Sequence, residues 1–383
     1  MNIGIVCYPT FGGSGVVATE LGKALASKGH KVHFITYQQP VRLDLFSDNI
    51  FYHEVKVSDY PLFDYQPYEL VLTSKLVDVV KFEKLDILHV HYAIPHASAA
   101  YMAQHILKSE GIHIPFITTL HGTDITLVGK DSSFAPVITF AINESNAVTA
   151  VSESLKQDTL EHFNIKREIE VIPNFICLEQ YNLNESIQEL KHSFAPNNER
   201  VLVHVSNFRK VKRTQDVIRI FDIVRKKMPA KLLMVGDGPE RHHLEELCRE
   251  LGTCHLVKFV GKVKDTERIL AASDVFILPS ESESFGLAAL EAMAARTPVI
   301  STNTGGIPEV NEHGISGFLS NVGDVEDMAN NTLKILDSDE TLDKFRAGAY
   351  EQAKKFDIHT ILPLYENLYN SVINKHPISL PLT

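Results

Sequence analysis

The sequence has few cysteines, no long apolar run and no excess of positive charge, and each shortage excludes a class of protein. Its four cysteines form no Cys-x-x-Cys pair, which suits reduced thiols in a cytoplasmic protein. No run of 18 apolar residues predicts a membrane span, and the opening MNIGIVCY lacks the basic start of a signal peptide. The net charge of −11 argues against nucleic acid or an anionic membrane as the main partner. We expect a cytoplasmic protein that binds small molecules and has no stable membrane association, with a homodimer as one alternative for its oligomeric state.

Short apolar strands alternate with amphipathic helices along the 383 residues, with one break near the middle. The pattern predicts strands at 2–8, 31–37, 86–91, 115–120, 147–151 and 168–173, and again at 200–207, 230–236, 255–261, 274–279, 297–302 and 317–320. Such alternation favours parallel, doubly wound sheets. We predict an α/β protein of two Rossmann-like domains, 1–176 and 177–359, that face a central cleft. A linker is expected at 177–198, and a last helix at about 360–383 that packs on the first domain.

A glycine-rich stretch, GGSG, follows the first predicted strand and begins a helix. Gly12, Gly13 and Gly15 would let backbone N–H groups approach a ligand, and the helix start favours an anion. The spacing matches neither the dinucleotide fingerprint nor the phosphate loop of nucleoside triphosphatases. An ordinary strand-to-helix turn is the alternative.

Histidines follow two later strands of the first half. His121 stands directly after the strand 115–120, where side chains of a doubly wound sheet reach the ligand; a capped loop histidine is the alternative. His89 and His91 share one face of a strand, but no cysteine or carboxylate joins them with zinc spacing. We therefore expect no metal there and regard Tyr92, at the strand end, as the better substrate contact.

Four cations stand close together after the first strand of the second half. Arg209, Lys210, Lys212 and Arg213 lie within SNFRKVKRT, in a chain that is acidic overall. A solvated loop or a nucleic-acid patch are the alternatives, but the cluster is short and lacks interleaved aromatic residues. Cations at a strand end suit a diphosphate better.

Two glutamates flank a predicted helix start in SESESFGLAALEAMAA. A helix that begins near Gly286 would point its free amides at an anion. Glu283 precedes that start and Glu291 follows eight residues later, a helical distance of about 12 Å. One of the two carboxylates could therefore meet sugar hydroxyls on one side of a diphosphate, and the other could meet sugar hydroxyls on the far side. A solvated surface glutamate is the alternative.

Together these stretches resemble the retaining GT-B glycosyltransferases of family GT4. Glu283-Ser284-Phe285-Gly286 with Glu291 matches the E-x7-E signature of that family, and GDGPE, TNTGGIPE and the GGSG loop follow in the family's order. The resemblance covers essentially the whole chain. One departure is Asn207, which stands where the family carries an arginine five residues before the lysine; the nearest arginine is Arg209.

The resemblance implies roles for individual residues. His121, Lys212 and Glu283 would be catalytic. The donor UDP-GlcNAc would be bound by Gly13, Ser206, Asn207, Arg209, Lys212, Gly236, Lys262, Val263, Glu283, Ser284, Phe285, Gly286, Leu287, Ala288 and Glu291. The acceptor would be bound by Ser14, Tyr92, Asn174 and Arg209.

The resemblance also implies a reaction, in which N-acetylglucosamine passes from UDP-GlcNAc to the hydroxyl of L-malate with retention, as in bacillithiol biosynthesis. No cofactor and no metal are expected, because no Asp-x-Asp follows a strand and Asp337-Ser338-Asp339 falls between late helices. A GT4 transferase with another small acceptor, a UDP-GlcNAc epimerase-like enzyme and a nucleotide-binding module without catalysis are the alternatives.

Overall fold

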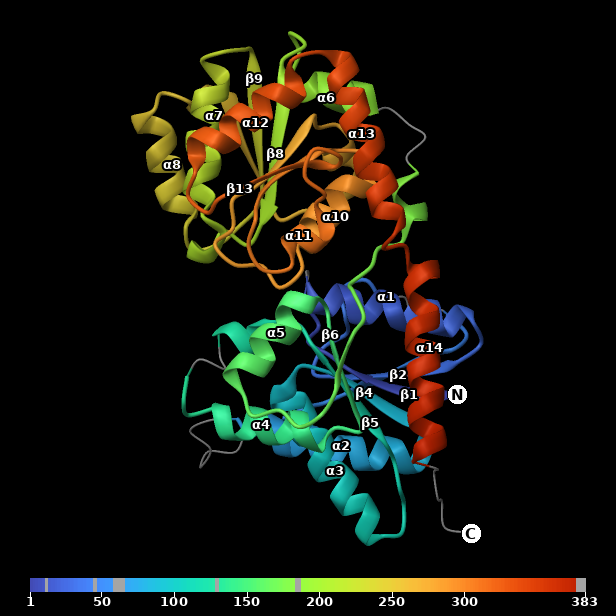
Figure 1. Ribbon diagram of the computed structural model, residues 1–383. Helices are drawn as coiled ribbons and strands as arrows, with labels where there is room; N and C mark the ends of the chain where they lie inside the picture. The colour runs from blue at the N-terminus through green and yellow to red at the C-terminus, as the bar shows by residue number, and fades with distance from the viewer. Residues whose placement is uncertain (11–12, 44–46, 58–65, 128–130, 183–186, 377–383) are drawn as a thin grey trace. The chain divides into compact units, whose positions relative to one another are not determined.

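The structure is a computed structural model that describes residues 1–10, 13–43, 47–57, 66–127, 131–182 and 187–376 (Figure 1). The chain divides into two compact units, of which the first holds Met1–Asn174 together with the chain from Ile358 onward. The second unit is Phe175–Asp357. Each unit contains a parallel sheet covered by helices, which confirms the predicted α/β class with two doubly wound sheets.

The first unit is built on a parallel sheet of order β3-β2-β1-β4-β5-β6-β7. Its strands are β1 (Asn2–Val6), β2 (Lys31–Thr36), β3 (Ile50–Glu54), β4 (Ile87–His91), β5 (Phe116–Leu120), β6 (Ala147–Ala150) and β7 (Ile169–Val171). The sequence pattern did not predict β3. This strand lies at the sheet edge with only Ile50 buried, so it lacks the continuous apolar run of a central strand.

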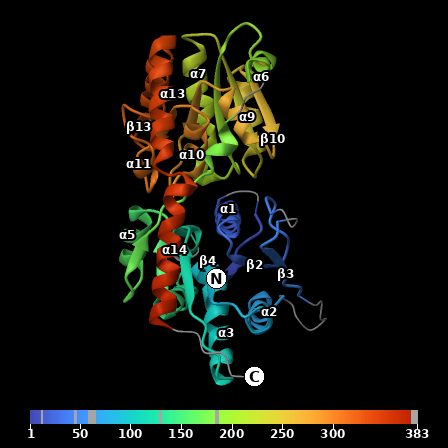
Figure 2. The same cartoon turned by 90° about the vertical axis from the view of Figure 1, so that its right-hand side faces the viewer.

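Helices cover both faces of this sheet. They are α1 (Ser14–Ser27), α2 (Tyr68–Glu83), α3 (Ser98–Ser109), α4 (Ala135–Glu144), α5 (Glu153–His162) and α14 (Ile358–Lys375). Helices α2 and α3 pack on one face, through a core that includes Ile35, Leu76 and Val90. Helix α14 returns from the far end of the chain and contacts α1 (Figure 2). This helix is hydrogen-bonded to the sheet, because the Tyr369 hydroxyl lies 2.7 Å from His89 Nδ1.

The second unit repeats this plan, with the strand order β10-β9-β8-β11-β12-β13. Its strands are β8 (Arg200–Ser206), β9 (Ala230–Gly236), β10 (Val257–Gly261), β11 (Val275–Leu278), β12 (Val299–Thr302) and β13 (Gly317–Ser320). Its helices are α6 (Ile187–Phe194), α7 (Thr214–Arg225), α8 (Arg241–Glu250), α9 (Thr266–Ala271), α10 (Leu287–Ala294), α11 (Ile307–Val310), α12 (Val325–Leu336) and α13 (Asp339–Lys354).

The order of strands reverses once in each sheet, between β1 and β4 and between β8 and β11. At such a point the two adjacent connections leave in opposite directions, and the carboxyl ends of the strands form an open crevice. In the first unit the loops that leave there carry Ser14 and Tyr92. In the second they carry Lys212 and Glu283.

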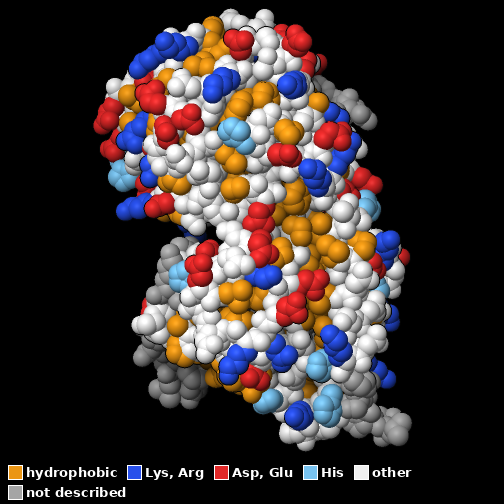
Figure 3. Space-filling view, viewed as in Figure 1, with side chains coloured by type: hydrophobic (Ala, Val, Ile, Leu, Met, Phe, Trp, Pro, Cys, Tyr) orange, Lys and Arg blue, Asp and Glu red, His pale blue; other side chains and the backbone are white. Residues whose placement is uncertain are grey.

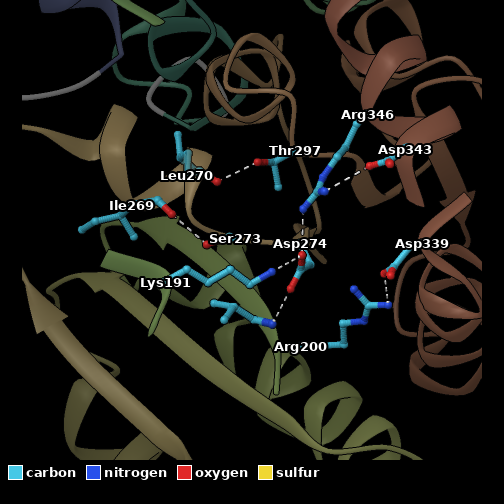
Figure 4. Close-up of polar contacts among 11 residues, drawn as sticks. Lys191, Arg200, Ile269, Leu270, Ser273, Asp274, Thr297, Asp339, Asp343 and Arg346 are labelled. Carbon is cyan, nitrogen blue, oxygen red and sulfur yellow. Dashed lines mark hydrogen bonds and ion pairs between the residues drawn. The ribbon is translucent and has the colours of Figure 1, made fainter. Parts of the chain in front are cut away.

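A buried aspartate joins several elements at the opposite end of the second sheet (Figure 4). Asp274 is fully buried at the start of β11. Its carboxylate accepts hydrogen bonds from Lys191 Nζ at 2.6 Å, Arg346 Nη2 at 2.8 Å and the Val201 backbone N–H at 2.9 Å. The carboxylate therefore connects α6, α13, β8 and β11.

We expect Asp274→Ala to lower the free energy of unfolding by about 3 kcal/mol, because breaking a buried charged network leaves its partners without compensation. Asp343→Ala is the matched control: its carboxylate binds Arg346 Nη1 at 3.2 Å but is 70% exposed, so its loss costs at most about 1 kcal/mol. Urea unfolding of both variants measures the difference, and equal losses would contradict this role for Asp274.

The surface carries charges of both signs. On the face in Figure 3, acidic and basic side chains are interspersed over each unit without a broad basic area. This distribution agrees with the acidic net charge. Within the described part of the chain, no helix combines the length and the apolar character needed to cross a membrane.

Candidate active site

The first unit brings Ser14 and Tyr92 together at the carboxyl ends of its strands. Ser14 is the first residue of α1, and Tyr92 follows β4. Their hydroxyl oxygens lie 2.7 Å apart, and the Tyr92 ring lies 5.3 Å from the ring of His121. Three of the residues predicted from separate parts of the sequence thus form one polar group.

His121 follows β5 and is hydrogen-bonded to a second histidine. Its Nε2 lies 2.8 Å from Nδ1 of His91, and both rings are buried. Burial lowers the pKa of His121 to about 3 and holds the pKa of His91 well below its ordinary value. Both imidazoles are therefore neutral at pH 7, and His121 is suited to hydrogen bonding with a sugar rather than to carrying a charge.

The neighbouring polar residues fix the backbone around this group. Asp124 Oδ2 accepts a hydrogen bond from the Ala93 N–H at 2.9 Å and Oδ1 one from the Gly122 N–H at 3.1 Å. The carboxylate therefore clamps the loop after β5 to the loop after β4. His89, which the sequence placed on one face with His91, stacks on that ring at 4.5 Å and is hydrogen-bonded to Thr119 and Tyr369.

Backbone geometry explains the glycines at the start of α1. Gly13 has φ +58°, a conformation that other residues adopt at a cost. A side chain at Gly15 would lie 2.5 Å from the Tyr8 carbonyl oxygen. Gly12 lies outside the described residues. The remaining acceptor candidate of the first unit, Asn174, is buried, and its Oδ1 has no hydrogen-bond partner among the residues that the structure describes.

The second unit brings Lys212 and Glu283 into direct contact. Lys212 Nζ donates to Glu283 Oε1 at 2.6 Å, with side chains that are 22% and 13% exposed. Ser280 Oγ donates to the same carboxylate oxygen at 2.8 Å. This ion pair joins the loops after β8 and β11, the two strands at which the order of the sheet reverses.

Two glycines contact the backbone of Glu283. A Cβ at Gly305 would lie 2.0 Å from the Glu283 carbonyl oxygen, and the Gly306 N–H donates to that oxygen at 2.9 Å. Only glycine allows the TNTGG turn to approach so closely. This contact gives a physical reason for a motif that the sequence could only match by pattern.

Helix α10 starts directly after this loop. Gly286, with φ +96°, precedes Leu287 and Ala288, whose N–H groups have no acceptor within the helix. Phe285 is buried and fixes the turn. The predicted arrangement, in which free amides follow Glu283, is therefore present. Glu291 lies about one turn into α10 and is half-buried, so it is less enclosed than the apolar sequence around it suggests.

The other donor candidates lie at the ends of neighbouring strands. Ser206 ends β8 and Gly236 ends β9, where a Cβ would lie 1.8 Å from the Ser206 carbonyl oxygen. Asn207 and Arg209 are exposed on the loop after β8. Lys262 and Val263 follow β10, at the sheet edge.

Sequence reasoning missed two supporting residues. Ser280 could have been predicted as a partner of Glu283, because it stands only three positions earlier in the sequence. His91 was considered only as a metal ligand, and its contact with His121 depends on the pairing of β4 with β5.

Two family models match the chain, one on each unit. The model for Glycosyltransferase Family 4 matches residues 11–180, and the model for Glycosyl transferases group 1 matches residues 186–352. Every candidate donor residue of the second unit lies within the second match.

Relatives of known sequence match over most of the chain. N-acetyl-alpha-D-glucosaminyl L-malate synthase of Bacillus anthracis is 46% identical over 377 residues, 97% of each chain. An uncharacterized glycosyltransferase of Methanocaldococcus jannaschii is 30% identical over 80% of each chain.

Solved structures show the same fold. Anabaena HepE in complex with UDP and glucose superposes with a TM-score of 0.82 at 21% identity, over 97% of this chain and 100% of the other. Sucrose-phosphate synthase of Thermosynechococcus elongatus reaches a TM-score of 0.80 at 19% identity, over 98% and 100% of the two chains.

Proposed function

Because the chain belongs to the family 4 glycosyltransferases, we propose that it transfers N-acetylglucosamine from UDP-GlcNAc to the hydroxyl of L-malate, with retention at the anomeric carbon. The observation that carries this proposal is the 46% identity to the Bacillus anthracis synthase over 97% of the chain. The ion pair of Lys212 and Glu283 beside the free amides of α10 supports it, since a nucleotide sugar offers a diphosphate and hydroxyls.

In the proposed reaction, the donor diphosphate lies at the start of α10. The amides from Phe285 to Ala288 and the ammonium of Lys212 offset its charge, which increases as UDP departs. Glu283 accepts hydrogen bonds from the donor hexose, and Glu291 accepts them from the ribose. His121 hydrogen-bonds the donor sugar near the reacting carbon.

The chemical step needs no protein nucleophile. The bond between the anomeric carbon and the phosphate oxygen breaks, and the malate hydroxyl oxygen bonds to that carbon on the same face. The hydroxyl proton passes to the departing phosphate oxygen. The protein contributes positioning and charge stabilisation.

The experiment that tests this function measures UDP release from UDP-GlcNAc with and without L-malate. Release that requires malate is expected. Release that ignores malate would overturn the acceptor assignment, and release that requires a different small alcohol would favour another family 4 reaction. Conversion of UDP-GlcNAc to an isomer without any acceptor would favour an epimerase.

The acceptor pocket is tested by Tyr92→Phe and Arg209→Ala. Losing a hydrogen bond to a charged group costs about 1.5–3 kcal/mol, so each variant should raise the KM for malate roughly 10–100-fold. The affinity for UDP should change little for Tyr92→Phe. Lys210→Ala, an exposed cation of the same loop, is the control for Arg209. An unchanged KM for malate in both variants would show that the pocket lies elsewhere.

A further inference from the structure

A second cluster of potential ligands lies in the first unit, away from the residues of the proposed reaction. His33 on β2, His53 on β3 and Glu83 at the end of α2 each place one ligand atom so that all three atoms lie within 4.8 Å of one another. Two of these side chains already touch, since His33 Nδ1 and His53 Nε2 lie 3.0 Å apart.

The sheet and its helix create this cluster. His33 and Ile35 point to the same face of β2, and Ile35 packs in the core beneath α2. His53 pairs with Ile35 across the strands, so its ring also lies on that face. Helix α2 ends at Glu83 above them, held by Asn2 Nδ2, which donates to the Glu83 carbonyl oxygen at 3.2 Å.

The three atoms lie close enough together for a small divalent ion to reach all of them once the carboxylate moves slightly inward. Ligand atoms of a tetrahedral zinc ion lie about 3.3 Å apart, because each is about 2.0 Å from the metal. Two imidazoles and one carboxylate form a common zinc ligand set and leave the fourth position for water. The ring of Phe51 stacks on His33 at 4.7 Å, which fixes the orientation of that ligand before binding.

The protonation states and nearby charges also matter for binding. Burial, together with His53 and Lys31, lowers the pKa of His33 to about 4. Burial is also the main cause that lowers the pKa of His53; Lys75 adds to this effect and Glu83 opposes it. Lys31 and Lys75 repel a cation, while Glu83 and the carboxyl end of α2 attract it.

One buried nitrogen remains without a partner. His33 Nε2 has no hydrogen bond among the residues that the structure describes, although the ring is only 1% exposed. The ring thus depends on a single polar contact, the one to His53. A metal ion between His33 Nδ1 and His53 would replace that contact with coordination of both rings.

We propose that His33, His53 and Glu83 bind one zinc ion, which fastens the edge strand β3 and the end of α2 to β2. This site is separate from the proposed reaction. Helix α2 ends just before β4 begins at Ile87, so Glu83 lies toward the amino ends of the strands. Ser14, Tyr92 and His121 lie at the carboxyl ends.

The test titrates Zn²⁺ into the whole chain after chelator treatment and desalting, with calorimetry as the readout. One equivalent should bind the natural sequence. Removing even an outer hydrogen-bond partner of a ligand costs roughly 10–100-fold in affinity. His53→Ala, which removes a ligand, should therefore weaken binding at least about 100-fold, and Glu83→Gln at least about tenfold. Both residues are only partly buried, so both variants should fold.

Matched variants control for the other histidines and carboxylates. His162→Ala removes an exposed imidazole, and Asp78→Asn removes an exposed carboxylate of the same helix α2; both should bind zinc as the natural sequence does. A Co²⁺ titration adds a visible absorption band that should be lost in His53→Ala. Equal zinc affinity in the natural sequence and His53→Ala would overturn the site. UDP release by Glu83→Gln without zinc should stay unchanged, which separates this test from that of the proposed function.

Discussion

His121→Ala is expected to lower kcat for malate-dependent UDP release roughly 10²–10³-fold, the usual cost of removing one preorganised hydrogen-bond group from a reacting centre. The affinity for UDP should change little, because the candidate donor residues other than Gly13 lie in the other unit. Single-turnover kinetics and calorimetry with UDP measure the two quantities. A loss confined to the KM for malate, with kcat intact, would assign His121 to acceptor binding instead.

His121→Asn provides the control for this prediction. The hydrogen bond between His91 Nδ1 and His121 Nε2 means that His121→Ala also leaves a buried nitrogen unsatisfied, which costs about 1–3 kcal/mol of stability. His121→Asn keeps a polar side chain at this place. Relative to His121→Ala, it should therefore restore much of the lost stability but little of the lost kcat. Equal recovery of both would indicate a structural role.

The pH dependence follows from the buried state of this histidine pair. The pKa of His121 is lowered to about 3, so the ring loses its proton below pH 4 and stays neutral as the pH rises further. The kcat of the natural sequence should therefore not fall as the pH drops through 6.5 because of His121. A fall in kcat near pH 6.5 that is present in the natural sequence and absent in His121→Asn would contradict this expectation. Such a fall would mean that His121 titrates near its ordinary pKa instead of the lowered value.

Lys212→Ala is expected to lower kcat by about 10³-fold, because it removes the cation that stabilises the departing diphosphate. The affinity for UDP should also fall, since the charge acts on the ground state as well. Because Lys212 Nζ lies 2.6 Å from Glu283 Oε1, the variant further leaves a carboxylate beside the diphosphate without its cation. Steady-state kinetics and UDP calorimetry measure both effects.

Lys210→Ala is the matched control for this variant, since Lys210 is exposed in the same turn and contributes only to the general field. It should change kcat less than about threefold, as expected for a screened surface charge. A double-mutant cycle with Glu283→Gln isolates the pair. If the losses in Lys212→Ala and Lys210→Ala were similar, the diphosphate would have to be neutralised by the amides of α10 instead.

Much of the fold could be predicted because its signals are local. Each predicted strand of the second half corresponds to an observed strand, from β8 to β13, since buried parallel strands need continuous apolar runs. The pattern failed at β3, whose side chains after Ile50 are exposed or half-buried. The joint action of the two units on one ligand stays a prediction.

The candidate site was predictable to a smaller extent. Strand ends indicated His121, Tyr92 and the cationic loop, because ligands of doubly wound sheets bind there. The partners of these residues were not predictable. For His91 the sequence offered only a metal role, which its spacing did not support, and nothing in the sequence joins His33, His53 and Glu83.

The sequence by itself determined the class of fold, the place of each motif at a strand end, and the acidic character that argues against a nucleic-acid surface. These follow from neighbours along the chain. Only the tertiary structure decided that Lys212 is paired with Glu283 and that His121 is hydrogen-bonded to His91. It also decided that His33 and His53 lie close to Glu83 at the end of α2. These contacts join residues that are far apart in sequence, and they exist because the order of strands brings separate loops together.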